Sequence, residues 1–269
     1  MKLTIISHTE HYKTNDGTIV GWGPTVNEIN HLLEIFDQIN HLAMLYEGDA
    51  PPSALPYVSE RVTFVPIPAV GGRSFGSKLK ILSQMPKTIK IVSRHVRQSD
   101  VFQLRTPTGI GVYLIPYFMF CSKKKGWFKY AGNWNQQNPP LGYRLQRFML
   151  KHQKRKVTIN GQWPNQPKHC ITFENPCLTQ TDLDEGKRIR DAKTIDDKVS
   201  FCFVGRLERE KGVERIIKAF DRLSLVDKKN VDVVHLVGDG KERSYFEDLA
   251  DKTLSLIHIS EPTRLESKS

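Results

Sequence analysis

Runs of β-branched and aromatic residues alternate along the chain with stretches whose apolar residues recur at helical spacing. The strand-like runs are Leu3–Ser7, Val62–Ile67, Asp100–Leu104, Gly126–Tyr130, Val157–Ile159, Cys170–Phe173, Val199–Val204 and Val231–Val237. Helical spacing occupies Val26–Ala43, Ser77–Val96, Leu141–His152 and Val213–Leu223. Strands that alternate with helices predict an α/β fold with a parallel sheet covered on both faces.

A polar and charged segment interrupts this pattern at residues 174–198, which read ENPCLTQTDLDEGKRIRDAKTIDDK. Such composition is typical of a linker between domains. The sequence therefore predicts a first domain over residues 1–175, a linker with a short helix over 176–198, and a second domain that starts at residue 199 and runs to 253.

The formal net charge of +11 is concentrated in one part of the chain. Residues 1–60 carry a net charge of −6, residues 61–170 carry +19 with Asp100 as their one acidic residue, and residues 171–269 carry −2. Such a field attracts polyanions, namely nucleic acid, anionic lipid headgroups or phosphorylated small molecules. A solvated basic face kept for solubility is the alternative.

Several protein classes are disfavoured by simple features of the sequence. The four cysteines form no CxxC pair, which argues against a disulfide scaffold and against a zinc site. The start, MKLTIISHTE, becomes polar too early for a signal peptide, and the longest apolar stretch, Ile110–Cys121, is shorter than the roughly 20 residues of a spanning helix. We expect a soluble, cytoplasmic protein.

Residues 201–220, FCFVGRLEREKGVERIIKAF, have the features of an anion site. An apolar run that we expect to form a buried strand ends at Gly205, Arg206 follows it, and Lys211 and Gly212 precede a helix expected to begin at Val213. Cations beside a helix N-terminus and a glycine suit a phosphate or diphosphate at the carboxyl end of a parallel strand. A second turn of this kind lies at Gly238-Asp239-Gly240. For either turn alone, an ordinary loop with surface cations is the simpler interpretation.

The string GRLEREKG resembles the GRL-x-x-x-KG signature of glycosyltransferase family 4. VGDG at residues 237–240 resembles the regular companion of that signature, PTVNEINHLLEIFD the first helix of the family, and ENPCLTQTDL the segment before its second domain. The resemblance covers residues 1 to about 253. It implies a GT-B fold of two Rossmann-like domains, the second only partly present here, and a retaining transfer of sugar from a nucleotide-diphospho-sugar.

The resemblance also implies roles for particular residues. Arg206, Lys211, Gly205 and Gly212 would bind the donor diphosphate; Gly21 and Gly23 would let a first loop approach the sugar or phosphate; and Gly238 and Gly240 would lie on cleft loops. The first domain would hold a glycan or a lipid-linked acceptor for cell-surface polysaccharide synthesis. No cofactor and no metal would be required. The +19 segment suggests an anionic membrane surface as a partner, at the inner face of the plasma membrane, and no nucleic acid is expected.

The first domain departs from the family pattern after the strand at Asp100–Leu104. Where the family often places histidines, this chain has DVFQLRTPTG, so no catalytic histidine can be assigned. Arg105 either binds an anionic acceptor or phosphate or is a surface cation. We expect Asn133 and Trp134 at the cleft, as acceptor-binding residues, with Phe128 and Tyr130 in the core.

The end of the chain lacks the acidic E-x7-E motif that the resemblance implies after VGDG. Instead, LSLIHISEPTR, residues 254–264, resembles the translation of a transposase sequencing-library adapter. Residues 254–269 are therefore expected to be a non-native tail, with the chain ending inside its second domain and inactive as a transferase on its own. A genuine strand over Leu256–Ile259 is the alternative, and the encoding DNA decides between them.

Two other functions stay open at this stage. A basic nucleic-acid-binding protein would account for the +19 segment, although it leaves the GRLEREKG string unexplained. A protein that binds sugar nucleotides without transferring the sugar would also account for that string. Sugar transfer by an enzyme with a complete second domain separates these functions from the first.

Overall fold

The computed structural model describes residues 1–72, 75–174, 178, 180–194, 198–253 and 257–260. The chain divides into two compact units, Met1–Gln180 (unit 1) and Thr181–Ser269 (unit 2). The division falls inside the segment that the sequence marks as a linker. In that segment a helix, α6 (Gln180–Ala192), has no buried residue, which fits its polar sequence.

Unit 1 is built on a nine-stranded sheet. The parallel strands lie in the order β5-β3-β1-β6-β7-β8-β9, while β2 and β4 extend the sheet antiparallel from the end of β1. Their bounds are β1 (Lys2–Lys13), β2 (Ile19–Trp22), β3 (Gln38–Tyr46), β4 (Ala54–Pro56), β5 (Val62–Ile67), β6 (Val101–Thr106), β7 (Gly126–Tyr130), β8 (Val157–Asn160) and β9 (Cys170–Phe173). The α/β class with a parallel sheet is thereby confirmed.

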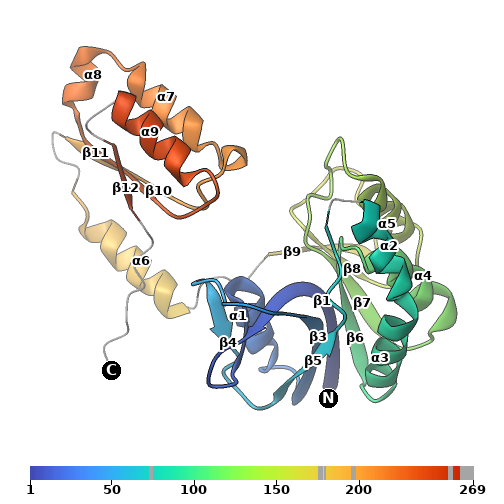
Figure 1. The fold of residues 1–269 in the computed structure, drawn as a ribbon. Helices are drawn as coiled ribbons and strands as arrows, with labels where there is room; N and C mark the ends of the chain where they lie inside the picture. Colours follow the sequence, from blue (N-terminus) through green and yellow to red (C-terminus); the bar gives the residue numbers. More distant parts are fainter. Residues whose placement is uncertain (73–74, 175–177, 179, 195–197, 254–256, 261–269) are drawn as a thin grey trace. The chain divides into compact units, whose positions relative to one another are not determined.

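Helices cover both faces of this sheet (Figure 1). The larger core lies on the face covered by α2 (Phe75–Ser83), α3 (Met85–Arg97), α4 (Gly111–Pro116), a π-helical turn (Tyr117–Cys121) and α5 (Leu141–Lys151). The smaller core lies under α1 (Gly23–Leu32), where Ile29 packs with Leu3, Ile5 and Ile39. Because consecutive strand residues point to opposite faces, Phe102 and Leu104 enter the first core while Gln103 and Arg105 face the α1 side.

The helix predicted over Val26–Ala43 is wrong in its second half. Helix α1 ends at Leu32, and Gln38–Tyr46 forms β3 in the interior of the sheet. Ile39–Met44 are all buried because this strand is covered on both faces. A strand buried on both faces loses its apolar–polar alternation, and its apolar residues then fall by coincidence at helical spacing.

Unit 2 is a three-stranded parallel sheet in the order β10-β11-β12, formed by Val199–Val204, Val231–Val237 and Ile257–Ser260. Helices α7 (Val213–Asp221) and α9 (Arg243–Thr253) pack on one face, where Leu236, Ile217 and Phe246 are fully buried. A short helix, α8 (Leu225–Lys229), precedes β11. The other face carries exposed residues, namely Cys202, Val204, His235 and His258. The expectation of a buried strand before Gly205 is therefore wrong, because β10 lies at the edge of this small sheet and five of its six residues are exposed.

Part of the expected non-native tail lies within this sheet. Ile257–Ser260 pair with β11 in parallel, and Ile257 is 8% exposed. This part of the structure agrees with a strand at that position. Residues 254–256 and 261–269 lie outside the described residues, as does Cys177.

Candidate functional site

Two glycine-containing loops meet at the carboxyl edge of the sheet in unit 2. The Gly205 amide donates to the Val237 carbonyl at 3.0 Å, and the Leu207 amide donates to the Asp239 carbonyl at 2.9 Å. A Cβ atom on Gly238 would lie 1.9 Å from the Gly205 carbonyl oxygen, and one on Gly240 would lie 2.4 Å from that of Leu207. These glycines are therefore required for backbone-to-backbone packing of the two loops.

Gly212 has a different structural role. It adopts φ +81°, a left-handed conformation that favours glycine, where a short 3₁₀ turn (Arg209–Lys211) becomes helix α7. As the N-cap of α7, Gly212 has no side chain to accept from the first amides of the helix. Uncapped amides at a helix N-terminus are good donors to an anion.

The two cations predicted at this edge are both accessible. The Arg206 side chain is 69% exposed and forms an ion pair with Glu208. Lys211 is exposed at the end of the 3₁₀ turn. Glu208 is partly buried, but the Arg206 guanidinium is in water, and an ion pair at the surface contributes only about 0–1 kcal/mol. Arg206 can therefore exchange Glu208 for a phosphate at little cost.

Sequence reasoning missed a further pair that fixes this edge. The Glu242 carboxylate accepts from the Arg209 amide at 2.7 Å and lies 3.2 Å from the Arg209 Nε atom. The Arg209 guanidinium also lies 4.7 Å from the centre of the Tyr245 ring. These contacts tie the turn before α7 to the turn before α9, and only the fold brings the two charges together.

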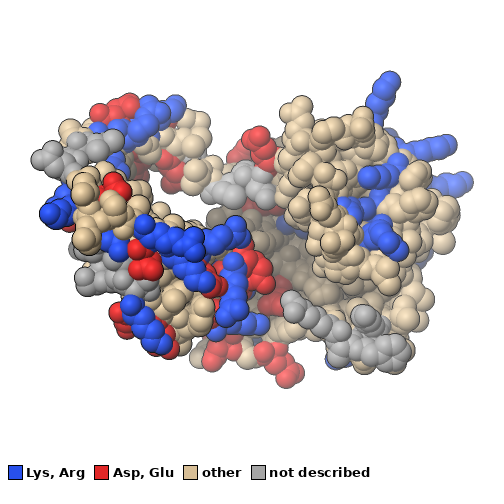
Figure 2. Space-filling view, turned by 90° about the horizontal axis from the view of Figure 1, so that it is seen from above, with Lys and Arg blue, Asp and Glu red and all other residues tan. Residues whose placement is uncertain are grey.

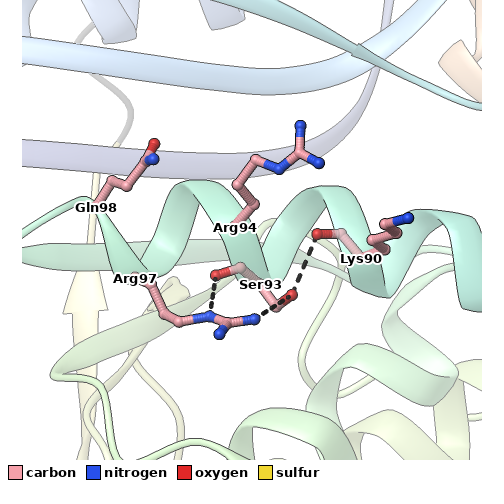
Figure 3. Close-up of a pocket in the computed structure, with 5 residues that line it drawn as sticks. All are labelled: Lys90, Ser93, Arg94, Arg97 and Gln98. Atoms are coloured by element: carbon pink, nitrogen blue, oxygen red, sulfur yellow. Dashed lines mark hydrogen bonds between the residues drawn. The ribbon is translucent and has the colours of Figure 1, made fainter.

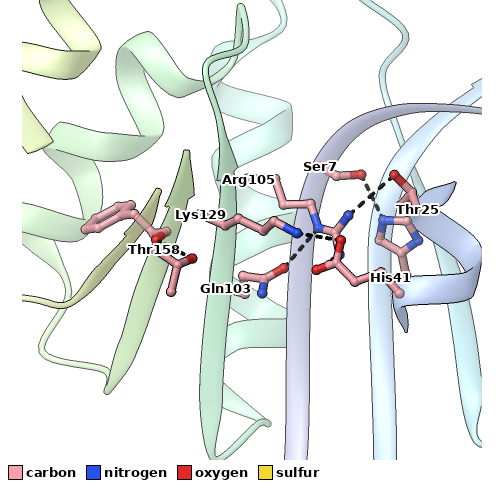
Figure 4. A network of polar contacts seen from close by, with 9 residues as sticks. Ser7, Thr25, His41, Gln103, Arg105, Lys129 and Thr158 are labelled. Carbon is pink, nitrogen blue, oxygen red and sulfur yellow. Dashed lines mark hydrogen bonds and ion pairs between the residues drawn. The ribbon is translucent and has the colours of Figure 1, made fainter. Parts of the chain in front are cut away.

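A second polar cluster is buried in unit 1 between α1 and the sheet (Figure 4). The Glu28 carboxylate of α1 lies 3.1 Å from the Arg105 guanidinium of β6 and 2.5 Å from the Lys129 ammonium of β7. All three side chains are less than 10% exposed. The interpretation of Arg105 as a surface cation is therefore wrong.

Neighbouring groups complete the surroundings of these cations. The Arg105 Nε atom donates to Gln103 at 2.9 Å, and the Lys129 ammonium lies 3.6 Å from the centre of the Phe173 ring. Burial lowers the pKa of Arg105, while the Glu28 carboxylate acts in the opposite direction. The Glu28 carboxylate thus joins α1 to β6 and β7, and Lys129 extends the cluster to Phe173 of β9.

A chain of hydrogen bonds continues this polar layer toward the carboxyl end of β1. The Tyr57 hydroxyl lies 2.8 Å from His11 Nε2 and 2.5 Å from His41 Nδ1, and His41 Nε2 lies 2.8 Å from the Ser7 hydroxyl. His11 Nδ1 lies 3.0 Å from the Thr9 carbonyl, which can only accept. With neutral rings, each group then donates to the next, from Ser7 through His41 and Tyr57 to His11.

Burial keeps both imidazoles neutral. It lowers the pKa of His11 to about 4 and the pKa of His41 well below its ordinary value. The direction follows because burial removes water from the charged form. Neutral rings are also what the hydrogen-bond order requires, since His⁺ would donate from both nitrogens.

Gly21 and Gly23, which were predicted to approach the sugar or phosphate, are each packed closely against another residue of unit 1. Gly21 belongs to strand β2, and a Cβ there would lie 2.4 Å from His11 Nε2. Gly23 begins α1, and a Cβ there would lie 2.7 Å from the Ser53 carbonyl oxygen. Both are explained by close packing.

The two residues expected at the cleft of unit 1 have different environments. Trp134 is 4% exposed and packs edge-on against Tyr130 in the large core, so the structure does not place it on a surface. Asn133 is exposed and accepts from the Asn135 amide at 2.9 Å. Tyr130 and Phe128 are in the core, as expected.

Within the described part of the chain, no group of three or more His, Cys, Asp or Glu side chains is placed to hold a metal ion. No helix in that same part is long and apolar enough to cross a bilayer.

Comparison with known families gives one match, at the end of the chain that holds the glycine loops. Residues 185–261 match the family Glycosyl transferases group 1. No curated protein matches the chain in sequence. The match includes Gly205, Arg206, Lys211 and Gly212, the residues that carry the resemblance seen in the sequence.

Several solved structures resemble this chain over nearly its whole length. Sucrose-phosphate synthase from Thermosynechococcus elongatus matches with a TM-score of 0.60 at 13% identity, over 98% of this chain and 71% of that one. WaaG, a glycosyltransferase involved in lipopolysaccharide biosynthesis, matches with a TM-score of 0.53 at 12% identity, over 97% and 70%. A putative UDP-N-acetylglucosamine 2-epimerase from Listeria monocytogenes also reaches 0.53, at 10% identity, over 97% and 69%. Because a transferase and an epimerase share this fold, the fold alone does not assign an activity.

Proposed function

We propose, from the match of residues 185–261 to the group 1 glycosyl transferases, that the chain carries the donor-binding residues of a retaining glycosyltransferase. The donor is a nucleotide-diphospho-sugar, and the acceptor is a glycan or lipid-linked molecule of cell-surface polysaccharide synthesis. Unit 2 holds the donor and unit 1 the acceptor. Retention of the anomeric configuration follows from the family resemblance alone.

The arrangement of Arg206 and Lys211 at the amino end of α7 carries this proposal. Breaking the bond between sugar and diphosphate leaves a nucleoside diphosphate with additional negative charge. Two exposed cations and the uncapped amides that follow Gly212 are placed to neutralise that charge as it develops. Glu208 would release Arg206 to the diphosphate when the donor binds.

The buried cluster of unit 1 supports the acceptor side without touching the acceptor. Arg105 and Lys129 share Glu28 and lie under α1, so we assign them a positioning role at the carboxyl ends of β6 and β7. Asn133 is exposed and stays a candidate for contact with the acceptor. Trp134 is withdrawn as a candidate because it is in the core.

The proposal extends to the metal requirement of the enzyme and to its location in the cell. We propose that transfer needs no metal, because the cations and the helix terminus supply the charge that a metal would supply. Activity in the presence of EDTA is the corresponding measurement. We also propose that the enzyme acts on the inner face of the plasma membrane, supported by the basic segment over residues 61–170.

The test is nucleotide binding followed by transfer. UDP and GDP titrated into the 269-residue chain should bind, and Arg206→Ala or Lys211→Ala should weaken binding. We propose that this chain alone transfers no sugar, since it lacks the E-x7-E motif that the resemblance implies. In an enzyme with a complete second domain, either substitution should lower turnover by about 10²-fold or more. Nucleotide binding without any transfer in that complete enzyme would favour the non-catalytic binder.

A further inference from the structure

The outward face of helix α5 carries an apolar stripe that the fold of unit 1 does not use. Leu141, Leu145 and Phe148 are 74%, 46% and 60% exposed, and they recur at i, i+4 and i+7. The three side chains line a shallow hollow of about 530 Å³ together with Gly142 and Arg144.

The opposite face of α5 is the one that packs against the rest of unit 1. There Leu150 is buried, and the buried Gln146 side chain bonds to the Thr108 amide and carbonyl. The packing of α5 is thus satisfied without the stripe. Large apolar side chains that lie next to one another on a protein surface often mark an interaction site.

Cations flank the stripe on α5 and also occur on α3. Arg144 and Lys151 share the exposed face of α5, which has no acidic residue. On α3, Lys87, Lys90, Arg94 and Arg97 are all exposed at helical spacing, again without an acidic residue.

Three of these α3 side chains, Lys90, Arg94 and Arg97, line a second hollow of about 400 Å³ together with Ser93 and Gln98 (Figure 3). Helices α3 and α5 pack on the same face of the sheet. Figure 2, which marks Lys and Arg in blue, shows such side chains projecting from this helical part of unit 1.

We propose that the outer surface of α3 and α5 docks on an anionic lipid bilayer. Leu141, Leu145 and Phe148 enter the boundary between headgroups and acyl chains, while the cations of α3 and α5 contact the lipid phosphates. Charge complementarity identifies the partner, because residues 61–170 hold 20 basic residues and one acidic residue. A nucleic acid would use the cations but would gain little from exposed leucines.

The inference rests on the proposed location of the enzyme at a membrane. It adds which surface of the protein contacts the bilayer. It does not require sugar transfer, because the docking surface lies in unit 1 and the candidate donor site in unit 2. A vesicle assay on the full chain therefore separates the two proposals, since it contains no donor and measures no transfer.

The experiment is flotation of the 269-residue chain with vesicles of phosphatidylcholine alone or with 30% phosphatidylglycerol. The chain should bind the anionic vesicles, and binding should fall when salt is raised from about 50 to 500 mM because the charges are screened. Leu141→Ser, Leu145→Ser and Phe148→Ser combined should lower the affinity at least about tenfold. Lys90→Gln with Arg94→Gln should lower it about fivefold per cation at low salt.

Matched variants in unit 2 serve as controls. Leu225→Ser with Val226→Ser changes two side chains of α8 that are 81% and 71% exposed. Lys187→Gln with Arg188→Gln changes two exposed cations of α6. Both should leave vesicle affinity unchanged, and far-UV circular dichroism should show that every variant is folded.

Three results would overturn the proposal. The first is vesicle affinity that neither the stripe nor the α3 substitutions change. The second is salt-sensitive binding to oligonucleotides with no binding to anionic vesicles. The third is a dimer in solution that the triple serine variant converts to a monomer, since the stripe would then contact a second copy of this chain.

Discussion

Each unit places two cations near the carboxyl ends of parallel strands, and the two pairs differ in what surrounds them. In unit 1, Arg105 and Lys129 are buried and share the Glu28 carboxylate. In unit 2, Arg206 and Lys211 are exposed on the segment that runs from Gly205 to Gly212. The position in the sheet is similar, but only the second pair is accessible to a ligand.

The difference shows that burial decides what a cation can do. A buried guanidinium that already has a carboxylate partner holds elements together, and breaking the pair is costly. An exposed guanidinium, such as that of Arg206 beside the partly buried Glu208, stays in contact with water and loses little when it exchanges its partner for a phosphate. The following changes separate these two roles.

Glu28→Gln should have the largest effect on stability. It leaves two buried cations without their shared carboxylate, which should cost about 3–5 kcal/mol of unfolding free energy. All four tryptophans, Trp22, Trp127, Trp134 and Trp163, lie in unit 1, so their fluorescence during denaturant unfolding reports on this unit.

The matched control for that change is Glu208→Gln, which removes the partner of exposed Arg206. It should change stability by less than about 1 kcal/mol. Equal losses in the two variants would mean that burial does not distinguish the two ion pairs.

The stability of unit 1 should fall as the pH is lowered from about 6.5 toward 4. The folded-state pKa of His11 is lowered to about 4 by burial, so the unfolded chain binds more protons in this range. The stabilisation that comes from keeping His11 neutral is fully present above the pKa of the unfolded chain. It decreases by about 3 kcal/mol as the pH falls to about 4. His11→Gln should make the pH dependence shallower, and an unchanged slope in this variant would show that His11 is not the group responsible.

Gly238→Ala should destabilise unit 2 by about 1–3 kcal/mol, because its Cβ atom would overlap the Gly205 carbonyl oxygen. Gly186→Ala is a control in an open position of α6 and should be neutral or slightly stabilising. Hydrogen exchange at the amides of β10 and β11 measures both. If protection in the Gly238 variant matches that of the unsubstituted chain, the two loops are not held in contact as described.

The sequence was most informative where a strand is short, rich in β-branched or aromatic residues and bounded by turn residues. Strands β5, β7, β9, β10 and β11 have the predicted bounds for this reason. It failed at β3, where burial on both faces removed the alternation that identifies a strand. The polar layer under α1 was also missed, although the alternation of Phe102, Gln103, Leu104 and Arg105 places polar groups on the second face.

The partners of that layer could not be read from the sequence, because Glu28 lies 77 residues before Arg105 and only the sheet order brings them together. The turn chemistry of unit 2 is local, since Gly205, Arg206, Lys211 and Gly212 are close in sequence. Their positions could therefore be predicted from their spacing in the sequence. The contact between Arg209 and Glu242 could not, because it depends on the fold.

The central claim, that the exposed pair binds a diphosphate and the buried pair does not, is tested by calorimetric titration of UDP and GDP into the chain and its variants. Arg206→Ala and Lys211→Ala should each weaken binding at least about tenfold, with unfolding free energies within about 0.5 kcal/mol of the original. Unchanged affinity in both variants, or no binding of either nucleotide by the folded chain, would contradict the claim.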